Sequence, residues 1–137
     1  MTKSLPRILV LVAGLIAGAA LHAAPVLAGH AGLNGQSLDA EAAKSVLLGK
    51  RITIADTRVV IVIAKASAAQ DTFLQSRLGM NTSQFQNHWR RLFMTGGGSA
   101  PKIVETETDA CKVAAETPGA VVIAEAAAAT GLAVLAN

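Results

Sequence analysis

The chain has 137 residues, of which 52% are hydrophobic and 15% charged, and a formal net charge of +3. This length allows one domain with one modest core. No run of basic residues exceeds two, at Lys50-Arg51 and Arg90-Arg91, which argues against nucleic-acid binding. The single cysteine, Cys111, excludes an internal disulfide and a cysteine metal cluster, and we expect it to be buried in a helix.

The chain begins with the pattern of a secretory signal peptide. Lys3 and Arg7 form a short positive region, and an uncharged apolar run follows from Ile8 to Leu21. This run is too short to span a bilayer core, which needs about 20 residues. We therefore expect a periplasmic or secreted protein with no stable membrane anchor after cleavage.

Two positions suit a signal peptidase, which requires small residues at −3 and −1. Val26-Leu27-Ala28 predicts cleavage before Gly29, so that residues 1–28 form the signal peptide. Leu21-His22-Ala23 offers a second position, before Ala24. The alternative is a signal that is retained as an N-terminal anchor.

The first part of the exported chain predicts a lead-in, a helix and a strand. Residues 29–36 are Gly-rich, which indicates a loose lead-in. A helix is predicted over 38–48, with Ser37 as its N-terminal cap and Gly49 at its end. The segment 58–64 contains five consecutive β-branched residues, a pattern typical of a strand covered on both faces.

Two helices are predicted next. Ser67 stands in a capping position before a helix over 68–78 that ends at Gly79. A second helix runs from Asn81-Thr82-Ser83 to about residue 93. Its apolar residues recur on one face, which predicts a core position for Phe85, Trp89, Leu92 and Phe93.

The remaining segments alternate between strands and helices. Residues 95–99 form a loop before a short strand over 102–104. Thr106 to Asp109 matches a capping box, which predicts a helix over 107–116. A second buried strand is predicted over 120–124, a linker or helical turn over 126–130 and a last strand over 132–135. This order predicts an α/β fold with a small sheet.

Several segments, in their order and spacing, carry a resemblance to a known family. They are the helix from Ser37 to the Leu48-Gly49-Lys50 end, the helix from Ser67 to Gly79, the stretch from Phe85 to Gly96, and Thr117-Pro118-Gly119-Ala120-Val121. The chain resembles the small PstS-like proteins, which are related to the periplasmic phosphate-binding components of ABC transporters. The resemblance covers roughly residues 37–124.

The resemblance implies a single lobe of a periplasmic-binding-protein-like fold over 37–137, with a small mixed sheet flanked by helices. It also implies a substrate-binding role in transport, with phosphate as the default ligand. The family has a strand before its first helix, where this chain has the Gly- and Ala-rich residues 25–36. Where full-length relatives have Ser-Gly-Thr, this chain has Ser67-Ala68-Ala69.

The best candidate ligand site is the N-terminus of the predicted helix after Ser67. Its hydroxyl, the backbone N–H groups of Ala69 and Gln70 and the helix dipole all suit a phosphate or sulfate. Lys65 is close in sequence and would add positive charge. The simpler interpretation is that Ser67 caps the helix and binds nothing.

The glycine loop of Gly96, Gly97 and Gly98 is a second candidate. Glycines allow backbone N–H groups to turn toward an anion, and this loop would help to hold the same oxyanion. No Gly-Lys-Ser/Thr follows, so it is not a Walker loop. The simpler interpretation is a flexible connection between a helix and a strand.

The sequence predicts a binding protein rather than an enzyme. It lacks His-x-x-x-His, Gly-x-Ser-x-Gly and paired-carboxylate motifs, so we expect no catalytic residue, metal site or cofactor. The first hypothesis is an exported protein that binds a small oxyanion. The second is a non-catalytic envelope module that has lost ligand binding and binds a protein partner or itself.

Overall fold

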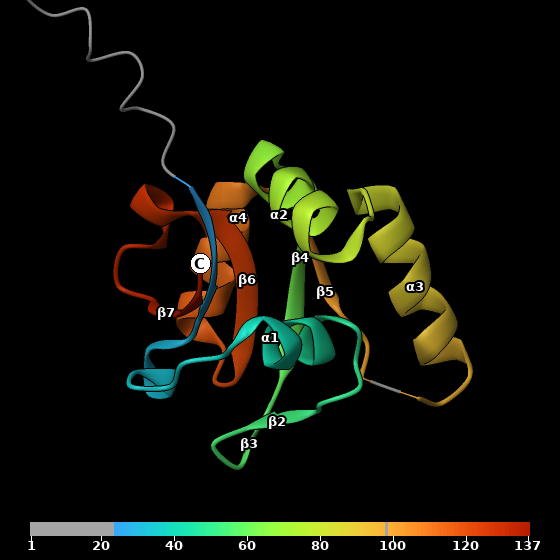
Figure 1. Cartoon of the computed structure of the whole chain (residues 1–137), viewed down its shortest axis with the longest axis horizontal. Helices are drawn as coiled ribbons and strands as arrows, with labels where there is room; N and C mark the ends of the chain where they lie inside the picture. The colour runs from blue at the N-terminus through green and yellow to red at the C-terminus, as the bar shows by residue number, and fades with distance from the viewer. Residues whose placement is uncertain (1–23, 98) are drawn as a thin grey trace, which may run out of the picture.

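The chain folds into a mixed α/β unit with a five-stranded sheet flanked by helices (Figure 1). The computed structural model describes residues 24–97 and 99–137, so the predicted signal residues 1–23 lie outside the described residues. The strands lie in the order β5 (Lys102–Thr106), β4 (Val60–Ala66), β6 (Ala120–Glu125), β1 (Pro25–Gly29) and β7 (Ala133–Ala136). The predicted α/β class with a small mixed sheet is therefore confirmed.

The sheet is mixed because one strand runs against its neighbours. Strand β4 is parallel to both β5 and β6, whereas β1 is antiparallel to β6 and to β7. The carboxyl ends of β4, β5 and β6 consequently lie at one edge of the sheet. The pairing of β4 with β6 is short and involves only Val60 and Ile61 on β4.

Strand β1 lies across the predicted boundary between the signal peptide and the lead-in. The segment predicted as the end of a signal peptide, followed by a loose lead-in, contains a strand in the sheet interior, with Val26, Leu27 and Ala28 at most 4% exposed. The next residues form a short 3-10 turn, η2 (Ala31–Leu33), whose Leu33 is also buried. Cleavage before Gly29 would remove most of this strand, whereas cleavage before Ala24 would leave it intact.

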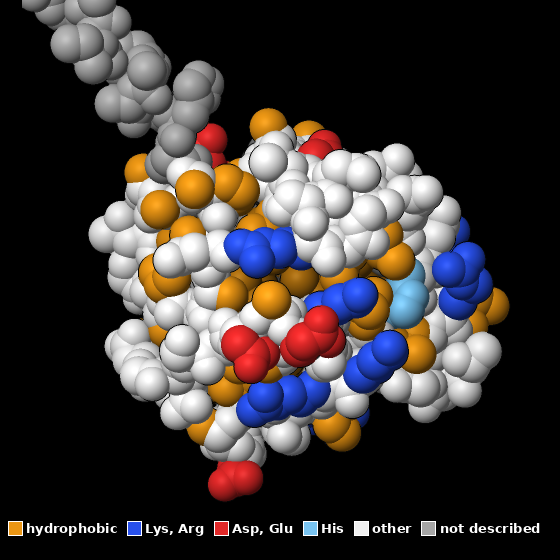
Figure 2. Space-filling view, in the orientation of Figure 1, with side chains coloured by type: hydrophobic (Ala, Val, Ile, Leu, Met, Phe, Trp, Pro, Cys, Tyr) orange, Lys and Arg blue, Asp and Glu red, His pale blue; other side chains and the backbone are white. Residues whose placement is uncertain are grey.

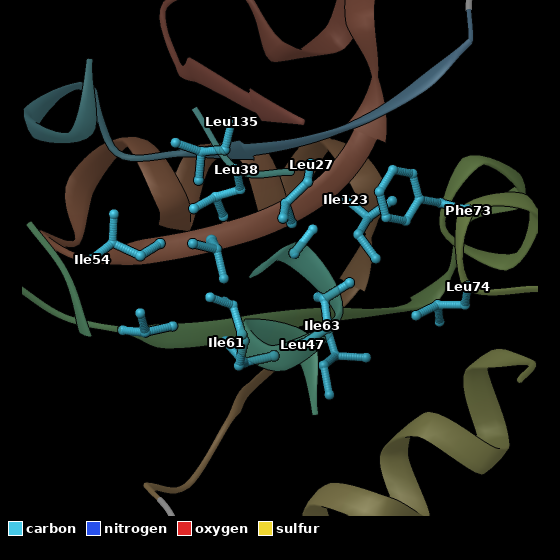
Figure 3. Close-up of a cluster of buried hydrophobic side chains, with 14 of the residues drawn as sticks. Leu27, Leu38, Leu47, Ile54, Ile61, Ile63, Phe73, Leu74, Ile123 and Leu135 are labelled. Atoms are coloured by element: carbon cyan, nitrogen blue, oxygen red, sulfur yellow. The ribbon is translucent and has the colours of Figure 1, made fainter. Parts of the chain in front are cut away.

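Helices cover both faces of the sheet. On one face, α4 (Glu107–Glu116) and the 3-10 turn η3 (Ala126–Ala129) pack on small side chains such as Ala64 and Ala120. The other face is covered by α1 (Ala40–Leu47), α2 (Ala68–Leu78) and α3 (Thr82–Met94). Figure 3 shows the larger core on this side, where Ile61 and Ile63 of β4 meet Leu47 and Leu74. No helix in residues 24–97 and 99–137 is long and apolar enough to cross a bilayer.

Side-chain caps fix where the helices begin. Ser67 caps α2 as predicted, and the left-handed Gly79 ends it. Thr106 caps α4 through the Asp109 N–H, also as predicted. The cap of α1 differs from the prediction: Asp39, rather than Ser37, accepts a 2.7 Å bond from the Ala42 N–H, so this helix begins two residues later.

A small hairpin precedes β4 and has no counterpart in the sequence prediction. Strands β2 (Thr53–Ile54) and β3 (Thr57–Arg58) pair with each other outside the main sheet. Their turn holds Ala55 and Asp56 at positive φ, where Asn-Gly is the usual signal for such a turn. The sequence pattern therefore contained no hairpin signal at this position.

Candidate functional site

The predicted site residues lie at opposite ends of β4. Lys65 and Ser67 lie at the carboxyl end of the strand, and Ala69 and Gln70 follow in the first turn of α2. The glycine loop follows α3 and precedes the amino end of the neighbouring parallel strand β5, with Gly98 outside the described residues. The structure thus keeps the lysine and serine together but separates them from Gly96 and Gly97.

The Ser67 hydroxyl is already hydrogen-bonded on both sides. Its oxygen accepts a 3.1 Å bond from the Gln70 N–H, which is the predicted cap. The same hydroxyl donates a 3.0 Å bond to Oε1 of Glu107, the first residue of α4. The Glu107 carboxylate therefore occupies the position where the predicted oxyanion would accept a hydrogen bond from this hydroxyl. Ser67 is only 9% exposed, so little of its surface is left for a second acceptor.

The charge around this site is predominantly negative. The Lys65 ammonium lies 2.8 Å from the Glu105 carboxylate, and both side chains are exposed. Asp71 lies in the first turn of α2, and Asp109 in the first turn of α4. Among the acidic groups here, only Glu107 contacts Ser67 itself. The Asp71 carboxylate accepts hydrogen bonds from Thr82. A phosphate entering here would meet the Glu107 carboxylate, so electrostatic repulsion opposes its binding.

Gln70 braces the strand through its buried side chain. Its amide accepts a 3.1 Å bond from the Ala64 N–H and donates a 2.8 Å bond to the Ala64 carbonyl. Its second N–H bonds the Thr82 hydroxyl at the start of α3. The pairing of β4 with β6 ends at Ile61. Beyond that point, the Gln70 amide supplies the hydrogen bonds that a neighbouring strand would otherwise make to the backbone of Ala64. The side chain of Gln70 therefore has a structural role that its position in the sequence did not predict.

The described part of the glycine loop ends a helix and does not form an anion nest. The Gly96 and Gly97 N–H groups donate to the carbonyls of Phe93 and Leu92, the usual way to finish a helix. Beyond the loop, the Ser99 hydroxyl accepts bonds of 3.1 and 3.0 Å from the Arg58 guanidinium. The cavity beside this pair has a volume of about 20 Å³, room for a water molecule but not for a phosphate.

A joint between α1 and α3 brings two of the resemblance motifs together. The Trp89 indole N–H donates to the Leu47 carbonyl at 2.9 Å, and His88 Nε2 lies 2.8 Å from the Leu48 carbonyl, so this nitrogen carries the proton. Both carbonyls belong to the last turn of α1, where backbone acceptors need partners. Contacts between α1 and α3 therefore explain why these residue types occur in 47–49 and 85–96, without a role in ligand binding.

Two further expectations need correction at the level of side chains. Phe85 and Trp89 are buried as predicted, but Phe93 is 52% exposed and lies outside the core. Cys111 is half-buried rather than fully buried. Burial, and to a smaller extent the negative charge of Glu107, raise the pKa of its thiol.

Comparison with known proteins gives no functional assignment. No family model matches the chain, and no curated protein matches it either. Within the described residues, no three His, Cys, Asp or Glu side chains are grouped closely enough to hold a metal ion. Any function must therefore be argued from the site itself.

Proposed function

We propose that this chain is an exported, non-catalytic interaction module on a single PstS-like lobe, whose small-ligand site is closed from within. The observation that carries this proposal is the 3.0 Å hydrogen bond from Ser67 to Glu107. In open α/β sheets, ligands bind beyond the carboxyl ends of the strands, where successive connections leave toward opposite faces. Here the connections after β4 and β5 diverge in this way, and the bond joins them.

The Glu107 carboxylate, which closes the site, is stabilised where it lies. Glu107 is the first residue of α4, so its carboxylate lies at the positive end of that helix dipole as well as next to Ser67. An external oxyanion would have to displace it and overcome the charges of Glu105, Asp109 and Asp71. We infer that such a module binds a protein partner, or itself, through its outer surface.

Oxyanion binding is the second candidate, and one arrangement favours it. The N-termini of α2 and α4 both follow the carboxyl ends of the adjacent parallel strands β4 and β5. Helix N-termini favour anions, and Ser67 lies between the two helices. In this alternative, phosphate displaces Glu107 and takes over its hydrogen bond.

Thermal melting in phosphate and in sulfate distinguishes the two candidates. A specific ligand at about 100 times its dissociation constant adds roughly 2.7 kcal/mol to stability. We expect no phosphate-dependent shift in the parent protein and a clear shift in Glu107→Gln, because this substitution removes the competing charge. Asp109→Asn is the matched control, since it removes a charge from the same helix turn but leaves the bond to Ser67 in place.

The other outcomes have definite meanings. A shift in the parent that Ser67→Ala abolishes would establish the oxyanion candidate and contradict the closed site. If neither the parent nor Glu107→Gln responds to phosphate, Glu107 is not what closes the site, and the proposed function is wrong.

A further inference from the structure

One end of the molecule combines positive charge with exposed apolar side chains. We call the surface formed by two segments, residues 48–58 and the described residues of 88–102 (88–97 and 99–102), the basic end. The two segments meet at the bonds from His88 and Trp89 to the end of α1, and again where Arg58 bonds Ser99. Figure 1 shows the hairpin and the C-terminal end of α3 on the lower side of the molecule, opposite the start of α2.

The charges of the basic end are almost entirely of one sign. Its six exposed Lys and Arg residues are accompanied by a single acidic residue, Asp56; the six are Lys50, Arg51, Arg58, Arg90, Arg91 and Lys102. On the face seen in Figure 2, most basic side chains lie over α1, the hairpin and α3, and a further basic group lies higher, near α2. Acidic side chains lie over α1 and the hairpin tip. Glu105, Glu107 and Asp109 lie at the opposite edge of the sheet.

The same end also exposes large apolar side chains. Ile52 is 49%, Phe93 52% and Met94 76% exposed, which makes three of the five large hydrophobic residues that are exposed in the described part of the chain. Phe93 and Met94 are the last two residues of α3, so they project from a helix end. The cavity beside Arg58 and Ser99 has a volume of about 20 Å³, too small to receive a side chain from a protein partner. The larger hollow that Arg91 lines, of about 400 Å³, lies toward Leu78 and Met80 and away from Arg58.

We propose that the basic end docks onto an anionic lipid bilayer. Lys and Arg bind the headgroup phosphates, while Phe93 and Met94 enter the interfacial layer. A bilayer accepts both features, because it offers negative charge and an apolar layer and requires no preformed groove. A nucleic acid would attract the cations but would leave Met94 and Ile52 without a matching contact. This proposal does not rest on the closed site at Ser67.

Vesicle sedimentation tests the proposal. The chain starting at Ala24 contains every helix and strand described above and lacks the apolar run 8–21, which would itself bind lipid. We expect it to sediment with phosphatidylcholine vesicles that contain about one third phosphatidylglycerol, and not with pure phosphatidylcholine. Binding should be largely lost in about 0.5 M NaCl, where screening is strong.

Matched variants locate the surface. Arg90→Gln/Arg91→Gln should lower the partition coefficient roughly 25-fold, because each basic residue contributes about fivefold near an anionic surface. Lys65→Gln/Lys112→Gln removes the same net charge elsewhere and should leave binding nearly unchanged. Phe93→Ser/Met94→Ser should weaken binding without altering its salt dependence. The six residues that these three double variants replace all have exposed side chains, so we expect each variant to keep the fold.

Three results would overturn the proposal. The first is no sedimentation with anionic vesicles at low salt. The second is an equal loss in both charge variants, which would show that only net charge matters. The third is binding to duplex DNA, or self-association of the protein, that is as strong as vesicle binding. Either would count against the bilayer if Arg90→Gln/Arg91→Gln abolished it and, for DNA, if salt weakened it. This result would assign the basic end to a nucleic acid or to a second copy of the chain.

Discussion

Gly49 shows how single residues fix the joint between α1 and α3. Its φ is +82°, and a Cβ built on it would lie 2.5 Å from Leu92 Cδ2 and 3.1 Å from Trp89 Cη2. Both a left-handed backbone and close packing therefore require glycine here. Gly79 has a similar φ of +68°, but nothing lies within 4 Å of the corresponding Cβ position.

Comparing alanine at these two glycines separates backbone strain from packing. Gly79→Ala should cost about 1 to 2 kcal/mol of stability through its left-handed backbone alone. Gly49→Ala should cost clearly more, because Leu92 and Trp89 must also move. Urea denaturation followed by the fluorescence of Trp89 measures both losses. Equal losses would mean that packing at the joint does not constrain Gly49.

Cys111 should react slowly despite being only half-buried. Its raised pKa keeps the thiol protonated at neutral pH, and the thiolate is the reactive form. We expect alkylation by iodoacetamide to be slower than in the urea-unfolded chain and to accelerate as the pH rises. Glu107→Gln removes the smaller cause of the shift and should speed the reaction modestly. Alkylation at the unfolded rate would contradict this account.

The same shift has a consequence for stability. As the pH rises past the ordinary thiol pKa, the unfolded chain releases its proton before the folded chain does. This group's contribution to stability is therefore complete below that pKa and declines above it. The direction follows from burial as the main cause, with the charge of Glu107 acting in the same sense.

At the scale of elements, strand β1 decides where a chain that can fold must begin. A chain that starts at Ala24 keeps the whole strand and should fold. A chain that starts at Gly29 loses Val26, Leu27 and Ala28, which are buried between β6 and β7, and should fail to fold. Circular dichroism and urea denaturation of the two chains measure this difference. A stable domain from Gly29 onward would show that β1 is dispensable.

The elements also show what sequence patterns can predict. Helices α2 and α4 were predicted at the observed bounds, because Ser67, Gly79 and Thr106 act within one helical turn. Strand β1 escaped prediction because Pro-Val-Leu-Ala-Gly is short and resembles a peptidase site. Its strand character becomes visible only through pairing with residues 121–125 and 133–136.

The candidate site was predicted only in its local part. The Ser67 cap depends on Gln70 three residues away, so the sequence was sufficient to predict it. Glu107 is forty residues away and was considered only as part of a helix start, because nothing local connects it with Ser67. The separation of the glycine loop from Ser67 likewise follows from the parallel pairing of β4 with β5.

At the scale of the whole molecule, two groups of charge lie at opposite ends of the strands β4 and β5. The predicted exported chain is nearly neutral, so composition gave no sign of a charged surface. The fold gathers Lys and Arg at the hairpin and the end of α3, and places Glu105 at the carboxyl end of β5, with Glu107 and Asp109 in the first turn of α4. A field of this kind orients the molecule as it approaches a charged surface.

The position of β1 also bears on when the chain acquires its structure. This early strand lies between β6 and β7, the last two strands of the sequence, and pairs Pro25 with Glu125. Contacts of such large sequence separation form late and slowly. A ribosome therefore releases nearly the complete polypeptide before the sheet can close. A secretion channel threads an extended, unfinished chain, so late closure of the sheet is compatible with the proposed export.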